Sequence, residues 1–137
     1  MAKRHLYITK HDMDRLDHLL IASVASAQDP GPLEDLQAEL DRGRLVTPRA
    51  VPPNVVTMNS RVRVRDLDSG QERVVTVVFP EDAEPAAGKV SILDPVGTAL
   101  LGYQVGDEIR WTGSKSVLRL KIKEMLYQPE AAGDHHL

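Results

Sequence analysis

The spacing of hydrophobic residues changes from a helical period to strict alternation along this chain. In the first third, two segments repeat an apolar residue every three or four positions: Met13, Leu16, Leu20, and then Leu33, Leu36, Leu40. The stretch between them, residues 29–32 (Asp-Pro-Gly-Pro), cannot continue a helix. Because this connection is short, the pattern predicts an antiparallel helical hairpin, a short coiled coil, over residues 1–45.

End signals refine the two predicted helices. Thr9 can cap the first helix, whose first turn holds Asp12 and Asp14 at the positive end of the helix dipole. We expect this helix to end near Ala27 and the second to begin near Pro32. At 1.5 Å per residue such an arm is only about 18–25 Å long.

From residue 55 the pattern becomes that of strands. Residues 61–65 (Arg-Val-Arg-Val-Arg) alternate strictly, and Asp68-Ser69-Gly70 predicts a hairpin turn into a second strand at 72–78. Further strands are expected at 89–93, 108–111 and 117–123, with a short helix over 96–101. The inward positions define an expected core of Val62, Val64, Val75, Val77, Ile92, Leu100, Leu101, Leu118, Leu120 and Ile122.

These segments predict an α+β protein. The helical hairpin of residues 1–45 precedes a stiff, proline-rich connector at 46–54. Residues 55–130 form a small antiparallel sheet wrapped on a short helix, and residues 131–137 are a tail without an apolar period.

Composition narrows the class of protein. The chain of 137 residues is 42% hydrophobic and 27% charged, as in ordinary soluble domains, and no apolar run reaches the ~20 residues that span a bilayer. It has no cysteine and no signal-peptide pattern, so we expect a cytoplasmic protein without disulfides and without a membrane partner. No histidine, serine or glycine-rich motif forms a catalytic set, a metal site or a phosphate cradle, so no catalytic residue, metal or cofactor is predicted.

One segment carries a specific pattern. Residues 94–107 read Asp-Pro-Val-Gly-Thr-Ala-Leu-Leu-Gly-Tyr-Gln-Val-Gly-Asp, in which Pro95 can start a helix and Gly102 can end it. This string resembles the carboxyl-terminal domain of the GreA/GreB family of transcription elongation factors. Residues 55–63 and 127–134 resemble the Rnk group of that family, the regulators of nucleoside diphosphate kinase. The resemblance implies an FK506-binding-protein-like fold for residues 55–130 and binding to bacterial RNA polymerase.

The hairpin tip is the first candidate site. In Gre factors a long arm enters the secondary channel of the polymerase, and acids at its tip help to hold a catalytic Mg²⁺. Asp29, Glu34 and Asp35 lie at or just after the turn here, and carboxylates suit that ion. The alternative is that these acids cap the second helix and keep its start soluble. The short arm and the lack of an Asp-x-x-Glu tip pair favour this second interpretation.

The second candidate is the corner before the short helix. The resemblance assigns polymerase docking to this place, here Asp94, Pro95, Val96 and Gly97. Leu93 stands where a polar residue is common in the family, so the role does not transfer to it. The alternative is structural: Asp94 caps the helix and Pro95 is its first residue. The two interpretations are compatible.

The third candidate is a basic sheet face. By period-two alternation the stripe Arg61, Arg63 and Arg65 shares one face, and a second stripe is formed by Arg119, Lys121 and Lys123. Such a face could contact polymerase or nucleic acid, or could simply be the solvated side of a half-buried sheet. The net charge of −3 argues against general nucleic-acid binding and leaves only indirect contact within an elongation complex.

The hypothesis that follows is a non-catalytic regulator, expected to be monomeric. It would dock on RNA polymerase at the rim of the secondary channel and compete there with Gre-type factors. The main alternative is a short-armed transcript-cleavage cofactor that holds a catalytic Mg²⁺ with its arm-tip carboxylates. A prolyl isomerase is a weaker alternative, because so few aromatic residues are available to line a pocket.

Overall fold

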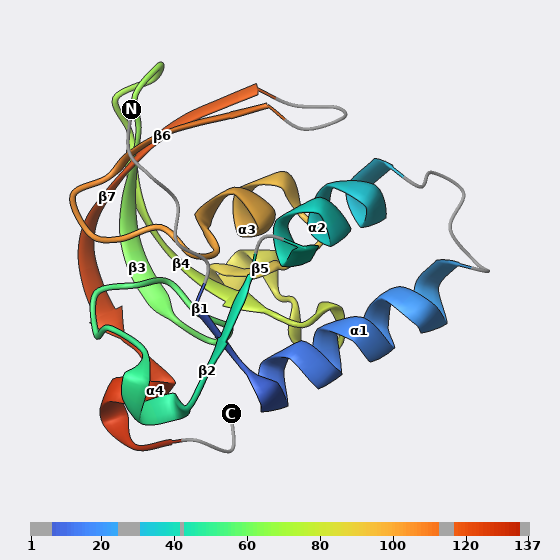
Figure 1. The fold of residues 1–137 in the computed structure, drawn as a ribbon. Helices are drawn as coiled ribbons and strands as arrows, with labels where there is room; N and C mark the ends of the chain where they lie inside the picture. Colours follow the sequence, from blue (N-terminus) through green and yellow to red (C-terminus); the bar gives the residue numbers. More distant parts are fainter. Residues whose placement is uncertain (1–6, 25–30, 42, 113–116, 135–137) are drawn as a thin grey trace.

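A twisted five-stranded sheet forms the body of the protein (Figure 1). The computed structural model describes residues 7–24, 31–41, 43–112 and 117–134. The sheet has the spatial order β5-β4-β3-β7-β6. Its strands are β3 (Arg61–Asp66), β4 (Glu72–Val78), β5 (Lys89–Ser91), β6 (Glu108–Thr112) and β7 (Val117–Tyr127). All neighbours are antiparallel except β4 and β5, which run parallel. The predicted α+β class is confirmed.

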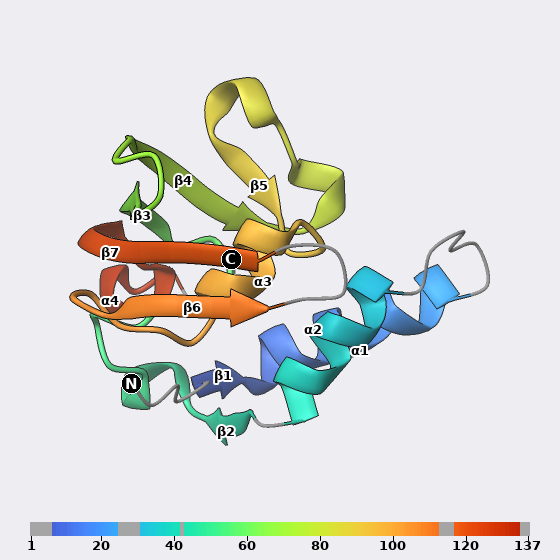
Figure 2. The same ribbon diagram turned by 90° about the horizontal axis from the view of Figure 1, so that it is seen from above.

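The predicted helical hairpin is present. Its helices are α1 (Lys10–Val24) and α2 (Gly31–Asp41). The capping role of Thr9 is confirmed, because its hydroxyl oxygen accepts a hydrogen bond of 3.1 Å from the backbone N–H of Asp12. The ends of the two helices that are far from the sheet reach past α3 (Pro95–Leu100), as Figure 2 shows. Ile21, near the far end of α1, is 76% exposed.

Two short strands flank the hairpin and were missed in the sequence. β1 (Tyr7–Thr9) pairs in parallel with β2 (Arg44–Val46). The pattern placed residues 1–45 in the hairpin and residue 46 in the connector, and three-residue strands are too short to show a period of two. A 3₁₀ turn at Pro48–Ala50 follows β2 within that connector. The paired strands therefore tie the two ends of the hairpin together at its base.

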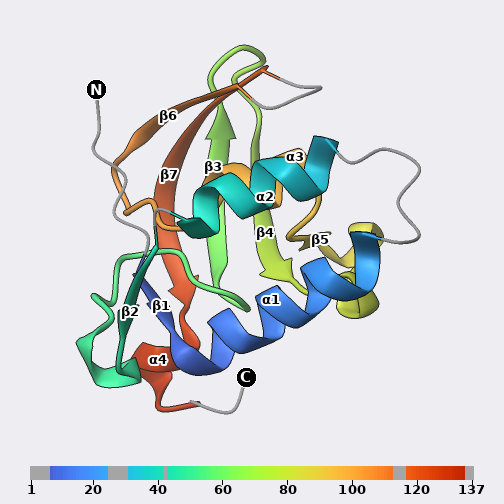
Figure 3. The ribbon, with the colours of Figure 1, turned by 45° about the vertical axis from the view of Figure 1, so that its right-hand side comes forward.

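The hairpin and the sheet share one hydrophobic core. Leu16 of α1 and Leu36 of α2 are completely buried in the same cluster as Ile92, Leu100 and Ile122. Figure 3 shows α1, α2 and α3 on one side of the sheet. Within the described residues the hairpin therefore has no separate core. The division of the chain into two domains near residue 45 stays a prediction.

The expected core is confirmed with one correction. Each inward residue named above is buried except Leu118, which is only half-buried. Leu118 lines a cavity of about 210 Å³ beside the β3–β4 turn, and this open space leaves part of its side chain accessible. Within the described residues no helix is long and apolar enough to cross a membrane.

The predicted end of the last strand needs correction. β7 continues to Tyr127, beyond the expected end at residue 123, and a short helix α4 (Pro129–Ala132) follows it and includes the first two residues of the predicted tail. The side-chain oxygen of Gln128 caps α4 by accepting from the N–H of Ala131 at 3.1 Å. Tyr127 donates a hydrogen bond to the Asp134 carboxylate, which raises the pKa of the Tyr127 phenol to about 12.

Candidate functional site

The corner before α3 has the capped geometry that the sequence predicts. The carboxylate of Asp94 accepts a hydrogen bond of 2.9 Å from the N–H of Val96, and Pro95 is the first residue of the helix. The Thr98 hydroxyl donates to the carbonyl of Ile92 at 2.6 Å, which fastens the helix to the preceding chain. The corner is therefore a rigid turn that presents Asp94 to solvent and keeps Gly97 buried.

A groove adjoins this corner. The cavity of about 210 Å³ lies between the start of α3 and the β3–β4 hairpin. Val96 lines one side, Glu72 and Arg73 line another, and the apolar floor includes Val64 and Leu120. A groove with an apolar floor and charged walls fits a side chain of a protein partner better than a phosphate backbone.

The arm-tip acids do not form a site among the described residues. Asp29 lies outside them. Glu34 is exposed in the first turn of α2, while Asp35 is half-buried and has interactions of its own. Within the described parts of the chain, no three histidine, aspartate or glutamate side chains are close enough together to hold a metal ion.

The basic face is offset by acidic residues. Arg63 forms an ion pair of 2.6 Å with Glu124, and Arg119 forms one of 3.0 Å with Asp68. Arg65 lies opposite Glu72 on one side and Lys121 on the other. Both ion pairs are largely exposed and contribute little to stability. They reduce the positive charge that a nucleic acid would meet, and indirect contact with nucleic acid in an elongation complex stays a prediction.

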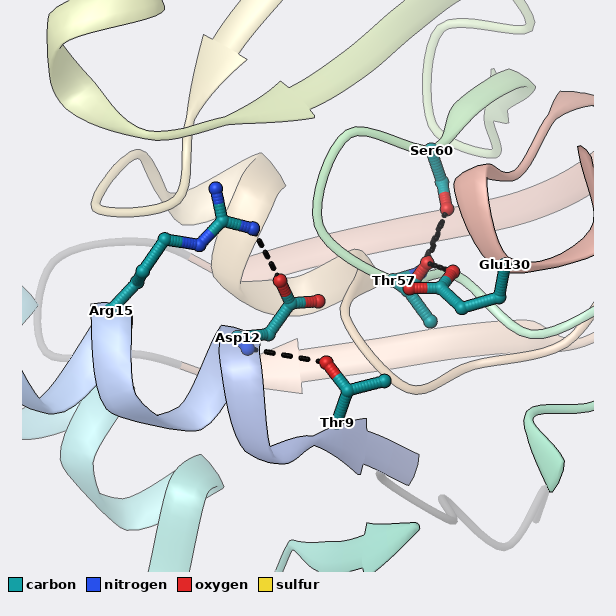
Figure 4. Close-up of polar contacts among 6 residues, drawn as sticks. All are labelled: Thr9, Asp12, Arg15, Thr57, Ser60 and Glu130. Carbon is teal, nitrogen blue, oxygen red and sulfur yellow. Dashed lines mark hydrogen bonds and ion pairs between the residues drawn. The ribbon is translucent and has the colours of Figure 1, made fainter. Parts of the chain in front are cut away.

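A buried polar junction at the base of α1 was missed in the sequence (Figure 4). Asp12 is only 2% exposed, and its carboxylate accepts a hydrogen bond of 2.5 Å from the Arg15 guanidinium. Burial raises the pKa of the Asp12 carboxyl, and the charge of Glu130 adds to this, whereas Arg15 acts in the opposite direction. The signal available in the sequence was an acid placed three residues before an arginine on the apolar side of α1.

The same junction holds α4 in place. The Thr57 hydroxyl donates to the Glu130 carboxylate at 2.6 Å and accepts from the Ser60 hydroxyl at 2.9 Å. The side-chain amide of Gln128 donates to the carbonyls of Pro52 and Val55, at 2.8 and 2.7 Å. α4 is thereby fastened to the segment that enters β3.

Comparisons with known proteins agree with this geometry. The family described as "Transcription elongation factor, GreA/GreB, C-term" matches residues 51–127, and the one described as "Rnk N-terminus" matches residues 4–46. A regulator of nucleoside diphosphate kinase from Escherichia coli K12 is 42% identical over 139 residues, covering 100% of both chains. The chain belongs to the Rnk branch of the GreA/GreB family.

Two further members of the GreA/GreB family are similar to this chain, one in structure and one in sequence. A structure of a prokaryotic transcription elongation factor GreA/GreB from Nitrosomonas europaea has a TM-score of 0.72 and 44% identity, and the match covers 89% of this chain and 99% of that one. The transcription elongation factor GreA of Thermodesulfovibrio yellowstonii is 38% identical over 79 residues, which is 58% of this chain and 50% of GreA.

The two segments that resemble the Rnk group meet in the structure. Residues 55–63 and 127–134 are far apart in the sequence, but Gln128 and Glu130 of the second bond directly to Val55 and Thr57 of the first. These segments form the junction between the hairpin, the sheet and α4. The two segments therefore meet where the hairpin joins the sheet, away from the corner at Asp94.

Proposed function

We propose that the protein is a non-catalytic regulator of transcription elongation that docks on bacterial RNA polymerase at the rim of the secondary channel and competes there with Gre-type factors. A Gre-like role in transcription follows from the family, and the docking mode is the proposal. The observation that carries it is the rigid corner at Asp94 and Pro95, with Asp94 exposed and Pro95 half-buried, beside a groove with an apolar floor.

A partner of this corner would be a protein surface. The Asp94 carboxylate already accepts one hydrogen bond from Val96 and has a second oxygen for a donor on the partner. Pro95 offers an apolar surface whose backbone conformation is fixed, so little entropy is lost when it is covered. Contact with nucleic acid would be indirect, because acids offset the basic face.

The hairpin would enter the channel only partway. α1 has 15 residues and α2 has 11, and at 1.5 Å per residue their lengths are about 22 and 16 Å. Such a short arm favours a regulator over a cleavage cofactor. We place this activity in the cytoplasm and expect the protein to act as a monomer.

A pull-down with core RNA polymerase tests the proposal. The parent chain should be retained, and an excess of a Gre factor should displace it. Pro95→Ala and Asp94→Lys should weaken retention, whereas Lys89→Ala, an exposed change on β5, should not. Retention that a Gre factor leaves unchanged would contradict the shared site.

A further inference from the structure

One side chain connects α1 to the end of β4. The guanidinium carbon of Arg15 lies 4.5 Å from the centroid of the Phe79 ring, directly after β4. A cavity of about 400 Å³ flanks this contact. It is lined from α1 by His11, Asp14, His18 and Leu19, and from the other side by Pro80 and Glu81. Arg15 therefore connects α1 to Phe79 beside a cavity that apolar side chains do not fill.

Both partners of Arg15 are held in place. Phe79 is 6% exposed and belongs to the hydrophobic core, so its ring has a fixed position relative to the sheet. Asp12 is buried in the first turn of α1, next to the cap made by Thr9. The guanidinium thus has a charged partner on its own helix and an aromatic partner on the sheet.

These two interactions are directional, unlike the leucine contacts that surround them. Burial of Leu16 and Leu36 depends on the apolar area that is covered and is not directional, and packed helices scatter by about 15–20° around their preferred angles. A guanidinium over an aromatic face, with a carboxylate at hydrogen-bond distance, depends on distance and orientation. Because Asp12 holds the guanidinium to α1, rotation of α1 on the sheet would carry Arg15 away from Phe79.

We propose that Arg15 is a positioning residue that fixes the angle at which the α1–α2 hairpin stands on the sheet. Asp12 orients its guanidinium from the helix, and Phe79 receives it on the sheet. The consequence for transcription rests on the proposed function, because the angle of the hairpin would set how it points into the channel once the corner at Asp94 is docked.

Distance measurements between spin labels test this directly. The chain has no cysteine, so Ala22→Cys on α1 and Val74→Cys on β4, both exposed, would carry the only labels. In the full chain, Arg15→Ala should broaden the distribution of distances between them. Lys10→Ala removes a positive charge from the same helix, where Lys10 pairs with the exposed Asp14, and should leave the distribution unchanged.

A distribution for Arg15→Ala identical to that of the parent would overturn the inference. If Arg15→Ala does not fold, Arg15→Lys serves instead, because it keeps the charge beside Asp12 and lacks the flat guanidinium on the ring. Broadening in that variant supports the inference, and an unchanged distribution overturns it.

Polymerase binding separates this inference from the proposed function. Retention of each variant by core RNA polymerase is measured alongside the distances, which need no polymerase. Broadened distances in a protein whose parent form does not bind polymerase would refute the proposed function alone. Unchanged distances with normal parent binding would refute the positioning role alone. Broadened distances together with weaker binding of Arg15→Ala support both.

Discussion

The α carbon of Gly97 faces the carbonyl oxygen of Ser91 so closely that a side chain cannot be accommodated there. A Cβ on Gly97 would overlap that backbone oxygen and lie 3.1 Å from the α carbon of Ile92. Neither neighbour is the end of a flexible side chain, so neither can move aside cheaply. Gly97 therefore serves the packing of α3 against the turn after β5, and Asp94, Pro95 and Val96 are the corner residues available to a partner.

Gly97→Ala should destabilise the protein by about 1–3 kcal/mol, the usual cost of overpacking. The direction of the change in unfolding free energy is informative, because replacing glycine by alanine in an unconstrained helix stabilises by up to about 1 kcal/mol. Urea unfolding followed by circular dichroism measures the change. A variant as stable as the parent would mean that α3 can shift away from Ser91.

Substitutions of Asp94 separate the cap from the docking surface. Asp94→Ala removes the acceptor for the Val96 N–H and should cost about 0.5–2 kcal/mol of unfolding free energy. Asp94→Asn keeps the acceptor and should be almost as stable as the parent, since both residues are good caps. Thermal unfolding of the pair checks this. Equal losses in both variants would show that the negative charge, and not the cap, stabilises the start of α3.

Much of the fold could be predicted because it depends on short-range patterns. The alternation around Val62 and Val64 and the turn at Gly70 define the β3–β4 hairpin, and Asp94 with Pro95 defines the start of α3. Such signals lie within a few residues of one another. The parallel pairing of β1 with β2 has no such signal, because its partners are separated by the whole hairpin.

A candidate site could be predicted from the sequence only where all its residues lie in one short segment. The corner at Asp94 is local and could be located from its own residues. The junction of Asp12, Arg15 and Glu130 depends on three-dimensional proximity between α1, the end of β4 and α4, which a single sequence does not reveal. For the same reason the basic stripes could be seen in the sequence, while the ion pairs of Arg63 and Arg119 that offset them could not.

The buried carboxyl of Asp12 should give stability a specific pH dependence. Its pKa in the fold is raised from 3.8, chiefly by burial, so the folded protein binds this proton more tightly than the unfolded chain. The resulting stabilisation is fully present below the unfolded pKa and is lost as pH rises through the folded pKa. From about pH 4 upward the parent should therefore lose stability relative to Asp12→Asn, which does not titrate.

Urea unfolding of both proteins at several pH values measures this difference. Asp12→Asn should keep the Thr9 cap, because the donor there is the backbone N–H of residue 12. The control is Asp14→Asn, which changes an exposed residue two positions after Asp12 on α1. The stability difference between this variant and the parent should not follow the pH trend expected for Asp12→Asn. A parent that gains stability over Asp12→Asn as pH rises would show that the ion pair with Arg15 outweighs burial.

Leu36 tests whether the hairpin and the sheet unfold together. It is completely buried in the shared core, so Leu36→Ala should cost about 2–5 kcal/mol. The only tryptophan, Trp111, lies on β6, so its fluorescence reports on the sheet. Far-ultraviolet circular dichroism reports mainly on the helices. The two signals should change together in parent and variant. Separate transitions would instead support an independent arm that ends near residue 45.

The last prediction distinguishes the regulator from the cleavage cofactor. Added to a backtracked elongation complex, the protein should produce little RNA cleavage above the intrinsic rate and should inhibit the cleavage that a Gre factor stimulates. A carboxylate ligates Mg²⁺ only at about 2.0–2.1 Å, and an arm about 16–22 Å long would leave Asp29, Glu34 and Asp35 short of the catalytic ion. Inhibition needs only the shared docking site, so Pro95→Ala should relieve it, whereas the triple alanine variant of the three acids should still inhibit. Strong cleavage that disappears in the triple variant would make this protein a short-armed cleavage factor.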